Sequence, residues 1–75
     1  MNISKMPLKE QVKFVRQTLL LTHSQLAKET GISEQTIIRW ENRKHVKPQM
    51  AQYGLFVAYC QSKGIICNDL GGKNK

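Results

Sequence analysis

The segment spanning residues 34–42, EQTIIRWEN, carries side chains that can form paired hydrogen bonds with a flat polar ligand. At about 3.6 residues per turn, Gln35 and Arg39 fall on one side of a helix. Ile37 and Trp40 fall on the opposite side. A glutamine amide can form two hydrogen bonds with adenine, and an arginine guanidinium can form two with guanine. The polar side of this segment is therefore a candidate surface for reading the edges of nucleic-acid bases.

A shorter helix is expected just before this segment, and the residues at its ends mark it. Thr22 and Gln25 have the spacing of a capping box at the start of a helix over residues 23–30. Gly31 can adopt the positive φ of a turn, and Ser33 can cap the helix that follows. Together these elements form a helix-turn-helix, a motif whose second helix enters the major groove of DNA. The constrained small and apolar positions of the motif hold Leu26, Ala27, Gly31, Ile32, Ile37 and Trp40.

The rest of the chain is expected to form helices around this motif, which predicts an all-α fold of four to five helices. A first helix beginning at Pro7 is indicated by an apolar stripe of Leu8, Val12, Val15 and Leu19. A later helix is expected from Pro48 to about Lys63, with a stripe of Met50, Tyr53, Val57 and Cys60. A short final turn or helix is suggested by Ile65, Ile66 and Leu70. No convincing alternation typical of strands is found.

The length of 75 residues favours a single domain with one modest hydrophobic core. We expect this domain at residues 7–70, a flexible arm at residues 1–6 and a flexible tail at residues 71–75. Leu20 stands where a tight connection between helices often has glycine. A differently shaped or buried turn is therefore expected at this position.

Composition favours an anionic partner and excludes several other classes of protein. Twelve lysine and arginine residues against five acidic residues give a formal net charge of +7, which suits nucleic acid. The two cysteines form no CxxC motif and lie at no ligand spacing from the two histidines, so no disulfide scaffold, metal or cofactor is expected. Because no signal peptide or long apolar run is seen, we expect a cytoplasmic protein.

From Val12 to Pro48 the chain resembles the XRE-like helix-turn-helix family of phage repressors and Cro proteins. The resemblance lies in V-x-x-V-R, then LTxxQLAxxxGIS, then TIxRWEN and a basic loop that ends in proline. It implies a compact, lambda-repressor-like domain with the helix-turn-helix at its second and third helices. It also implies an ion pair between Arg16 and Glu41, which would tie the first helix to the recognition helix. The chain departs from the family at His23, where glutamine is usual, and at Arg43, where glycine is common.

The resemblance and the chemistry of base edges assign roles to the residues in and around the recognition helix. Candidate base-reading residues are Glu34, Gln35, Ile38 and Arg39. Glu34 could accept a hydrogen bond from cytosine, but it could equally orient Arg39 or favour the helix N-terminus, and Ile38 could meet a thymine methyl or be of no consequence. Candidate phosphate-binding residues are His23, Thr36, Asn42, Arg43, Lys44 and Lys47. Any single one of these could be an ordinary solvated surface residue.

The sequence therefore predicts a sequence-specific regulator of transcription that binds double-stranded DNA, with a repressor favoured over an activator. We expect it to be bacterial or phage-encoded and associated with the nucleoid when bound. It is expected to bind as a homodimer, with an interface formed by Leu55, Phe56, Tyr59 and Ile66. The alternative is a protein-interaction module with the same fold, such as an antitoxin-like or bridging subunit. No arrangement of residues typical of an enzyme is found, so catalysis is not expected.

Overall fold

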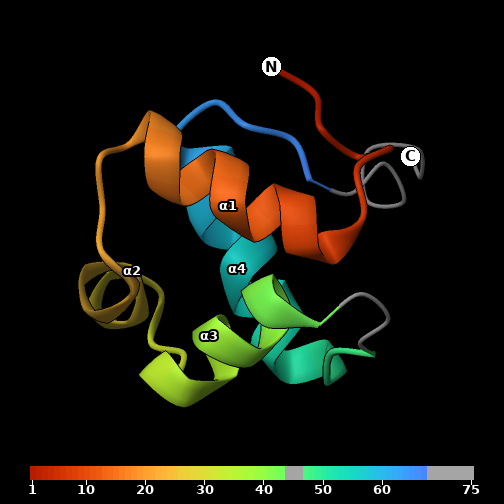
Figure 1. The fold of residues 1–75 in the computed structure, drawn as a ribbon. Helices are drawn as coiled ribbons and strands as arrows, with labels where there is room; N and C mark the ends of the chain where they lie inside the picture. Colours follow the sequence, from red (N-terminus) through yellow and green to blue (C-terminus); the bar gives the residue numbers. More distant parts are fainter. Residues whose placement is uncertain (44–46, 68–75) are drawn as a thin grey trace.

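The helices follow one another along the chain with short connections, as a computed structural model of residues 1–43 and 47–67 shows (Figure 1). They are α1 (Leu8–Thr18), α2 (His23–Thr30), α3 (Glu34–Asn42) and α4 (Met50–Ser62). Within these residues there is no strand, only an isolated parallel bridge between Asn2 and Ile66. The prediction of an all-α fold with a helix-turn-helix at its second and third helices is confirmed. No helix in the described ranges is long and apolar enough to span a bilayer.

Local hydrogen bonds set the ends of α2 and α3 as the sequence predicted. The Gln25 backbone N–H donates to Thr22 Oγ1 at 3.1 Å, and the Thr22 N–H donates to Gln25 Oε1 at 2.9 Å. Gly31 ends α2 with a φ of 82°, which glycine adopts at little cost. The Thr36 N–H then donates to Ser33 Oγ at 3.2 Å, so Ser33 caps α3. These bonds fix where the chain turns between the two helices.

Aromatic packing holds α3 against α4. On the inner side of α3, Ile37 is 0% and Trp40 is 2% exposed. The Trp40 ring packs edge-to-face with the rings of Tyr53 and Phe56, at centroid distances of 6.4 and 6.0 Å. This packing corrects the predicted face of α4, because Phe56 enters the core whereas Met50 is 85% exposed.

The turn between α1 and α2 is tight, and it is not buried. Leu20 has a φ of 57°, in the left-handed region that leucine rarely adopts, and its side chain is 88% exposed. The preceding α1 ends at Thr18, and the Leu21 N–H donates back to the Arg16 carbonyl at 2.8 Å. The expected alternative of a buried turn is therefore wrong, and the turn takes a shape that glycine would adopt more easily.

The two terminal segments lie side by side, an arrangement that the sequence did not predict (Figure 1). The Ile3 N–H donates to the Ile66 carbonyl at 2.8 Å, and the Ile3 side chain is only 3% exposed. Residues 1–6 were expected to form a flexible arm, but their first part is docked on the domain. The described part of the expected final helix, residues 65–67, is not helical; Leu70 and the tail at residues 71–75 lie outside the described residues.

A buried polar cluster fastens these terminal segments to α1 and α4. Gln11 Nε2 donates to the carbonyls of Ile3 at 3.1 Å and Cys67 at 2.9 Å. The Tyr53 hydroxyl donates to Gln11 Oε1 at 3.1 Å, and burial raises the pKa of Tyr53, so the hydroxyl keeps its proton. The thiol of Cys60 is buried beside Cys67, which raises its pKa and keeps it a neutral core residue.

Candidate nucleic-acid interface

The outer face of α3 presents most of the expected base-reading residues to solvent. Glu34, Gln35 and Arg39 are exposed, and Ile38 is half-buried beside them. Because Ile37 and Trp40 fill the opposite face, α3 cannot rotate without exposing them. The core therefore fixes which side of α3 looks outward, and that side carries the carboxylate, amide and guanidinium groups.

The residues expected to bind phosphate do not all reach the surface. Asn42, Arg43 and Lys47 are exposed just after the outer face of α3, and Lys44 lies outside the described residues. Thr36, expected to contact phosphate, does not reach the surface. It is only 7% exposed, and its hydroxyl accepts a 2.9 Å hydrogen bond from Ser33 Oγ. Thr36 therefore takes part in the cap of α3, and little of its side chain is exposed.

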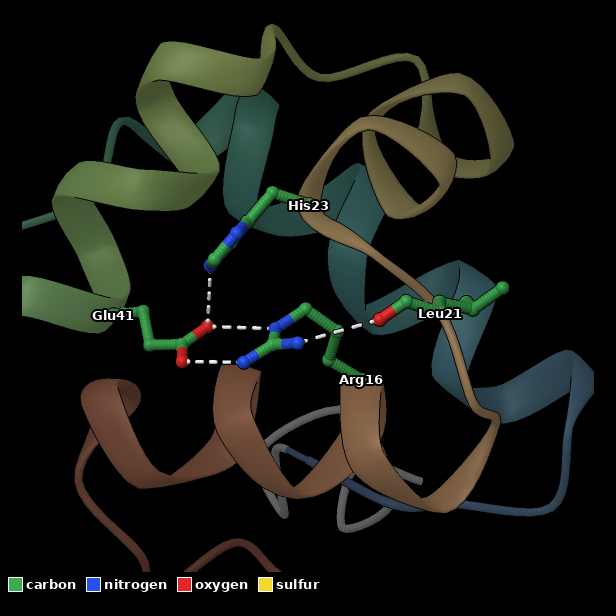
Figure 2. A network of polar contacts seen from close by, with 4 residues as sticks. All are labelled: Arg16, Leu21, His23 and Glu41. Carbon is green, nitrogen blue, oxygen red and sulfur yellow. Dashed lines mark hydrogen bonds and ion pairs between the residues drawn. The ribbon is translucent and has the colours of Figure 1, made fainter.

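An ion pair joins α1 to the C-terminal end of α3 (Figure 2). Arg16 Nη2 lies 2.8 Å from Glu41 Oε2, and Arg16 Nε lies 3.0 Å from Glu41 Oε1. Arg16 Nη1 also donates to the Leu21 carbonyl at 3.4 Å, in the connection to α2. The side chains of Arg16 and Glu41 are 21% and 12% exposed, so the pair is largely shielded from water. The resemblance implied this pair, and the structure shows it in a two-bond geometry.

Each member of this ion pair favours the charged form of the other. Hydrogen bonding to the Arg16 guanidinium holds the pKa of the Glu41 carboxyl below its ordinary value, although burial opposes the shift. The same hydrogen bond raises the pKa of Arg16. Both groups are therefore charged at neutral pH, and Glu41 can act only as a hydrogen-bond acceptor.

His23 is the third member of this network, and sequence reasoning missed its partner. It is the first residue of α2, and its Nε2 lies 3.0 Å from Glu41 Oε1 (Figure 2). Glu41 therefore links α1, α2 and α3 through one carboxylate. His23 was expected to contact phosphate, and its side chain remains 33% exposed. The departure of this position from the usual glutamine was the only signal in the sequence.

The expected dimer interface is divided between surface and core. Leu55 and Ile66 are 46% and 42% exposed, and Tyr59 is half-buried. Phe56 was expected at the dimer interface, but it is 0% exposed and packs against Trp40 in the core. Met50 was predicted to share the apolar stripe of Cys60, but the structure leaves it exposed at the surface.

Comparison with known proteins supports the identity of the motif. A family profile described as helix-turn-helix matches residues 12–52, more than half of the 75-residue chain. Neither the curated proteins nor the solved structures gave a significant match. The match begins inside α1 at Val12 and continues through α2 and α3 to the start of α4, so it includes both the outer face of α3 and the ion pair beneath it. The chain belongs to the XRE-type helix-turn-helix family of DNA-binding regulators.

Proposed function

We propose that this protein is a sequence-specific repressor that binds double-stranded DNA with α3 in the major groove. The observation that carries the proposal is the two-faced character of α3, whose inner residues Ile37 and Trp40 are buried while Gln35 and Arg39 are exposed. A helix presented in this way fits a major groove about 12 Å wide. The net charge of +7 supports the same partner.

The side chains of the outer face suggest how bases are read. Arg39 suits guanine and Gln35 suits adenine, because each side chain can form two parallel hydrogen bonds with that base. Glu34 lies at the N-terminus of α3, where its carboxylate either accepts from cytosine or orients Arg39. Ile38 is half-buried, which leaves part of its side chain for a thymine methyl. Arg43 and Lys47 follow at the surface and suit phosphate contacts.

Repression is the simpler regulatory outcome for such a domain. A protein that occupies its operator blocks other proteins from the same DNA without any further contact. Activation requires a second surface that binds the transcription machinery. We assign repression because the proposed DNA-binding face is sufficient for it.

The outer face of α4 suits a second copy of the chain. It carries Met50, Gly54 and Leu55, all exposed, and a Cβ added at Gly54 would meet no atom of residues 1–43 and 47–67 within 4 Å. Glycine inside a helix costs about 1 kcal/mol relative to alanine, and none of the described residues packs closely enough to require it there. No charged residue occurs in α4, so two positively charged copies could approach along this face. We therefore propose a homodimer that pairs through α4 and reads two half-sites about one helical turn apart.

The DNA-binding face can be tested before any operator is known. We expect a generic DNA duplex, titrated at low salt and followed by NMR, to shift the backbone amides of Gln35, Arg39 and Arg43. The amides of Ile3 and Gln11, in the buried cluster at the terminal segments, serve as the control and should move little. Shifts confined to α4 would contradict the proposal.

The dimer is tested by sedimentation of the free and DNA-bound protein. We expect Leu55→Glu to dissociate it, and Leu20→Glu to leave it intact, because Leu20 is exposed and belongs to the connection between α1 and α2, not to α4. A native protein that stays monomeric at high concentration and on DNA would refute the homodimer. It would favour the protein-interaction alternative, in which this face of α4 binds a different chain.

A further inference from the structure

The hydrogen bond between His23 and Glu41 fixes which imidazole nitrogen carries a proton. Because the Glu41 carboxylate can only accept, His23 Nε2 must donate across the 3.0 Å contact (Figure 2). In a neutral imidazole only one nitrogen bears hydrogen. Neutral His23 therefore keeps its proton on Nε2 and leaves Nδ1 with a lone pair. Such an Nδ1 cannot donate to a phosphate and would repel one.

Protonation changes what His23 can bind. The imidazolium carries a hydrogen on each nitrogen, so it can hold Glu41 through Nε2 and donate a second bond through Nδ1. Among the described residues, Nδ1 has no hydrogen-bond partner within the protein. The side chain is also 33% exposed, which leaves room for an outside acceptor.

The position of His23 places this nitrogen where DNA backbone is expected. His23 is the first residue of α2, and the first helix of a helix-turn-helix crosses the sugar-phosphate backbone. Unbonded N–H groups of a helix's first turn also favour a phosphate there. We propose that His23 is a proton-linked phosphate contact, so that binding of DNA is coupled to uptake of one proton at Nδ1. The proposal rests on the proposed function, because it concerns the same DNA complex.

The charges around the ring agree with this coupling. In the described structure, Glu41 from α3 is bonded to His23, and Arg16 from α1 is bonded to the same carboxylate. With neutral His23 these two charges cancel, and protonation gives the network a charge of +1. The charged residues of α2 itself, Lys28 and Glu29, lie more than one turn further along, and α4 has none. A phosphate therefore meets a neutral network when His23 is neutral and a cationic one when His23 is protonated.

Two quantities follow for the affinity of the protein for DNA. Uptake of one proton makes the association constant rise by at most about tenfold for each unit by which pH falls. One extra neutralised phosphate also steepens the slope of log K against log salt by about 0.9. Histidine side chains in general change charge between about pH 5 and 8, so the measurements cover that range.

The test measures binding to a generic DNA duplex by fluorescence anisotropy at several salt concentrations between pH 5.5 and 8. A generic duplex suffices because phosphate contacts carry no sequence information. His23→Gln is the test variant, since glutamine donates hydrogen bonds without titrating. His45→Gln is the matched control, as it removes the only other histidine. Nitrogen NMR of free native protein at pH 8 reports which ring nitrogen of His23 is protonated.

Each outcome bears on the proposal. We expect native protein and His45→Gln to bind more tightly and with a steeper salt slope at pH 5.5, whereas His23→Gln shows neither change. We also expect Nε2 to carry the hydrogen at pH 8. Equal pH dependence in native protein and His23→Gln, or a hydrogen on Nδ1 at pH 8, would overturn proton-linked binding and leave the proposed function standing. No binding of any duplex at any pH would overturn both.

Discussion

Removing the charge of Glu41 is the most informative perturbation of the fold beneath the proposed DNA-binding face. Glu41→Gln keeps the size of the side chain but leaves the Arg16 guanidinium without an anionic partner. In the native protein, two hydrogen bonds of 3.0 and 2.8 Å join the Arg16 guanidinium to the Glu41 carboxylate. The change should therefore loosen α3 from α1 and lower the free energy of unfolding.

The exposure of the two side chains sets the expected size of this loss. Exposed ion pairs contribute about 0.2–1 kcal/mol, whereas removing one partner of a fully buried pair costs about 3–5 kcal/mol. Arg16 and Glu41, at 21% and 12% exposed, lie between these limits. We expect Glu41→Gln to cost about 2 kcal/mol. For a domain of this size that lowers Tm by about 10 °C.

The assay is urea unfolding followed by circular dichroism, arranged as a double-mutant cycle with Arg16→Met. We expect a coupling energy of about 1 kcal/mol between the two positions. Glu29→Gln, an exposed carboxylate on α2, is the matched control and should change stability by less than about 0.5 kcal/mol. A coupling of zero, with Glu41→Gln no worse than Glu29→Gln, would refute the reasoning.

The remaining predictions concern acid stability, the polar cluster, the strained turn and base reading. The pKa of Glu41 in the folded protein is lowered from its ordinary value of 4.5, so the stability that Glu41 contributes is present above pH 4.5 and is lost as pH falls through the folded-state pKa. Urea unfolding at pH values from 6 to 2 should show this loss of stability, and Glu41→Gln should remove the pH dependence. Gln11→Ala should lower the free energy of unfolding by about 2–3 kcal/mol in the same assay, because it removes the donor to two carbonyls and an acceptor for Tyr53. A loss below about 0.5 kcal/mol would show that this cluster does not stabilise the fold. Leu20→Gly should raise stability by about 0.5 kcal/mol, since relief of the positive φ outweighs the added freedom of the unfolded chain, and a destabilised variant would argue against strain there. Arg39→Ala should lose about 1–3 kcal/mol on the preferred DNA and relax discrimination in a competition assay, whereas Arg43→Ala should weaken binding to all sequences alike; unchanged specificity would remove Arg39 from the reading residues.

The helix-turn-helix was predictable because its determinants are local. The capping bonds of Thr22, Gln25 and Ser33 join residues three positions apart, so their spacing in the sequence is enough to show them. Gly31 marks the turn for the same reason. The two faces of α3 were also predictable, because polar and apolar residues are cleanly separated around that helix.

Other features depend on contacts that spacing does not reveal. In α4 almost every side is apolar, so helical periodicity could not decide whether Leu55 or Phe56 faces the core. The structure buries Phe56 because the Trp40 ring offers it an edge-to-face contact. The hydrogen bonds from Gln11 to the terminal segments join residues far apart in the chain, so local sequence patterns cannot predict them. Likewise, His23 was read as a phosphate ligand without its link to Glu41.

Selection of bound duplexes from a random DNA pool shows whether the outer face of α3 reads DNA sequence. We expect enrichment of a two-fold symmetric sequence, with half-sites about one helical turn apart that contain guanine and adenine for Arg39 and Gln35. Arg39→Ala, selected in parallel, should lose the guanine preference alone. A pool that stays random after repeated rounds, or a consensus unchanged in Arg39→Ala, would contradict the claim that the outer face of α3 reads DNA sequence.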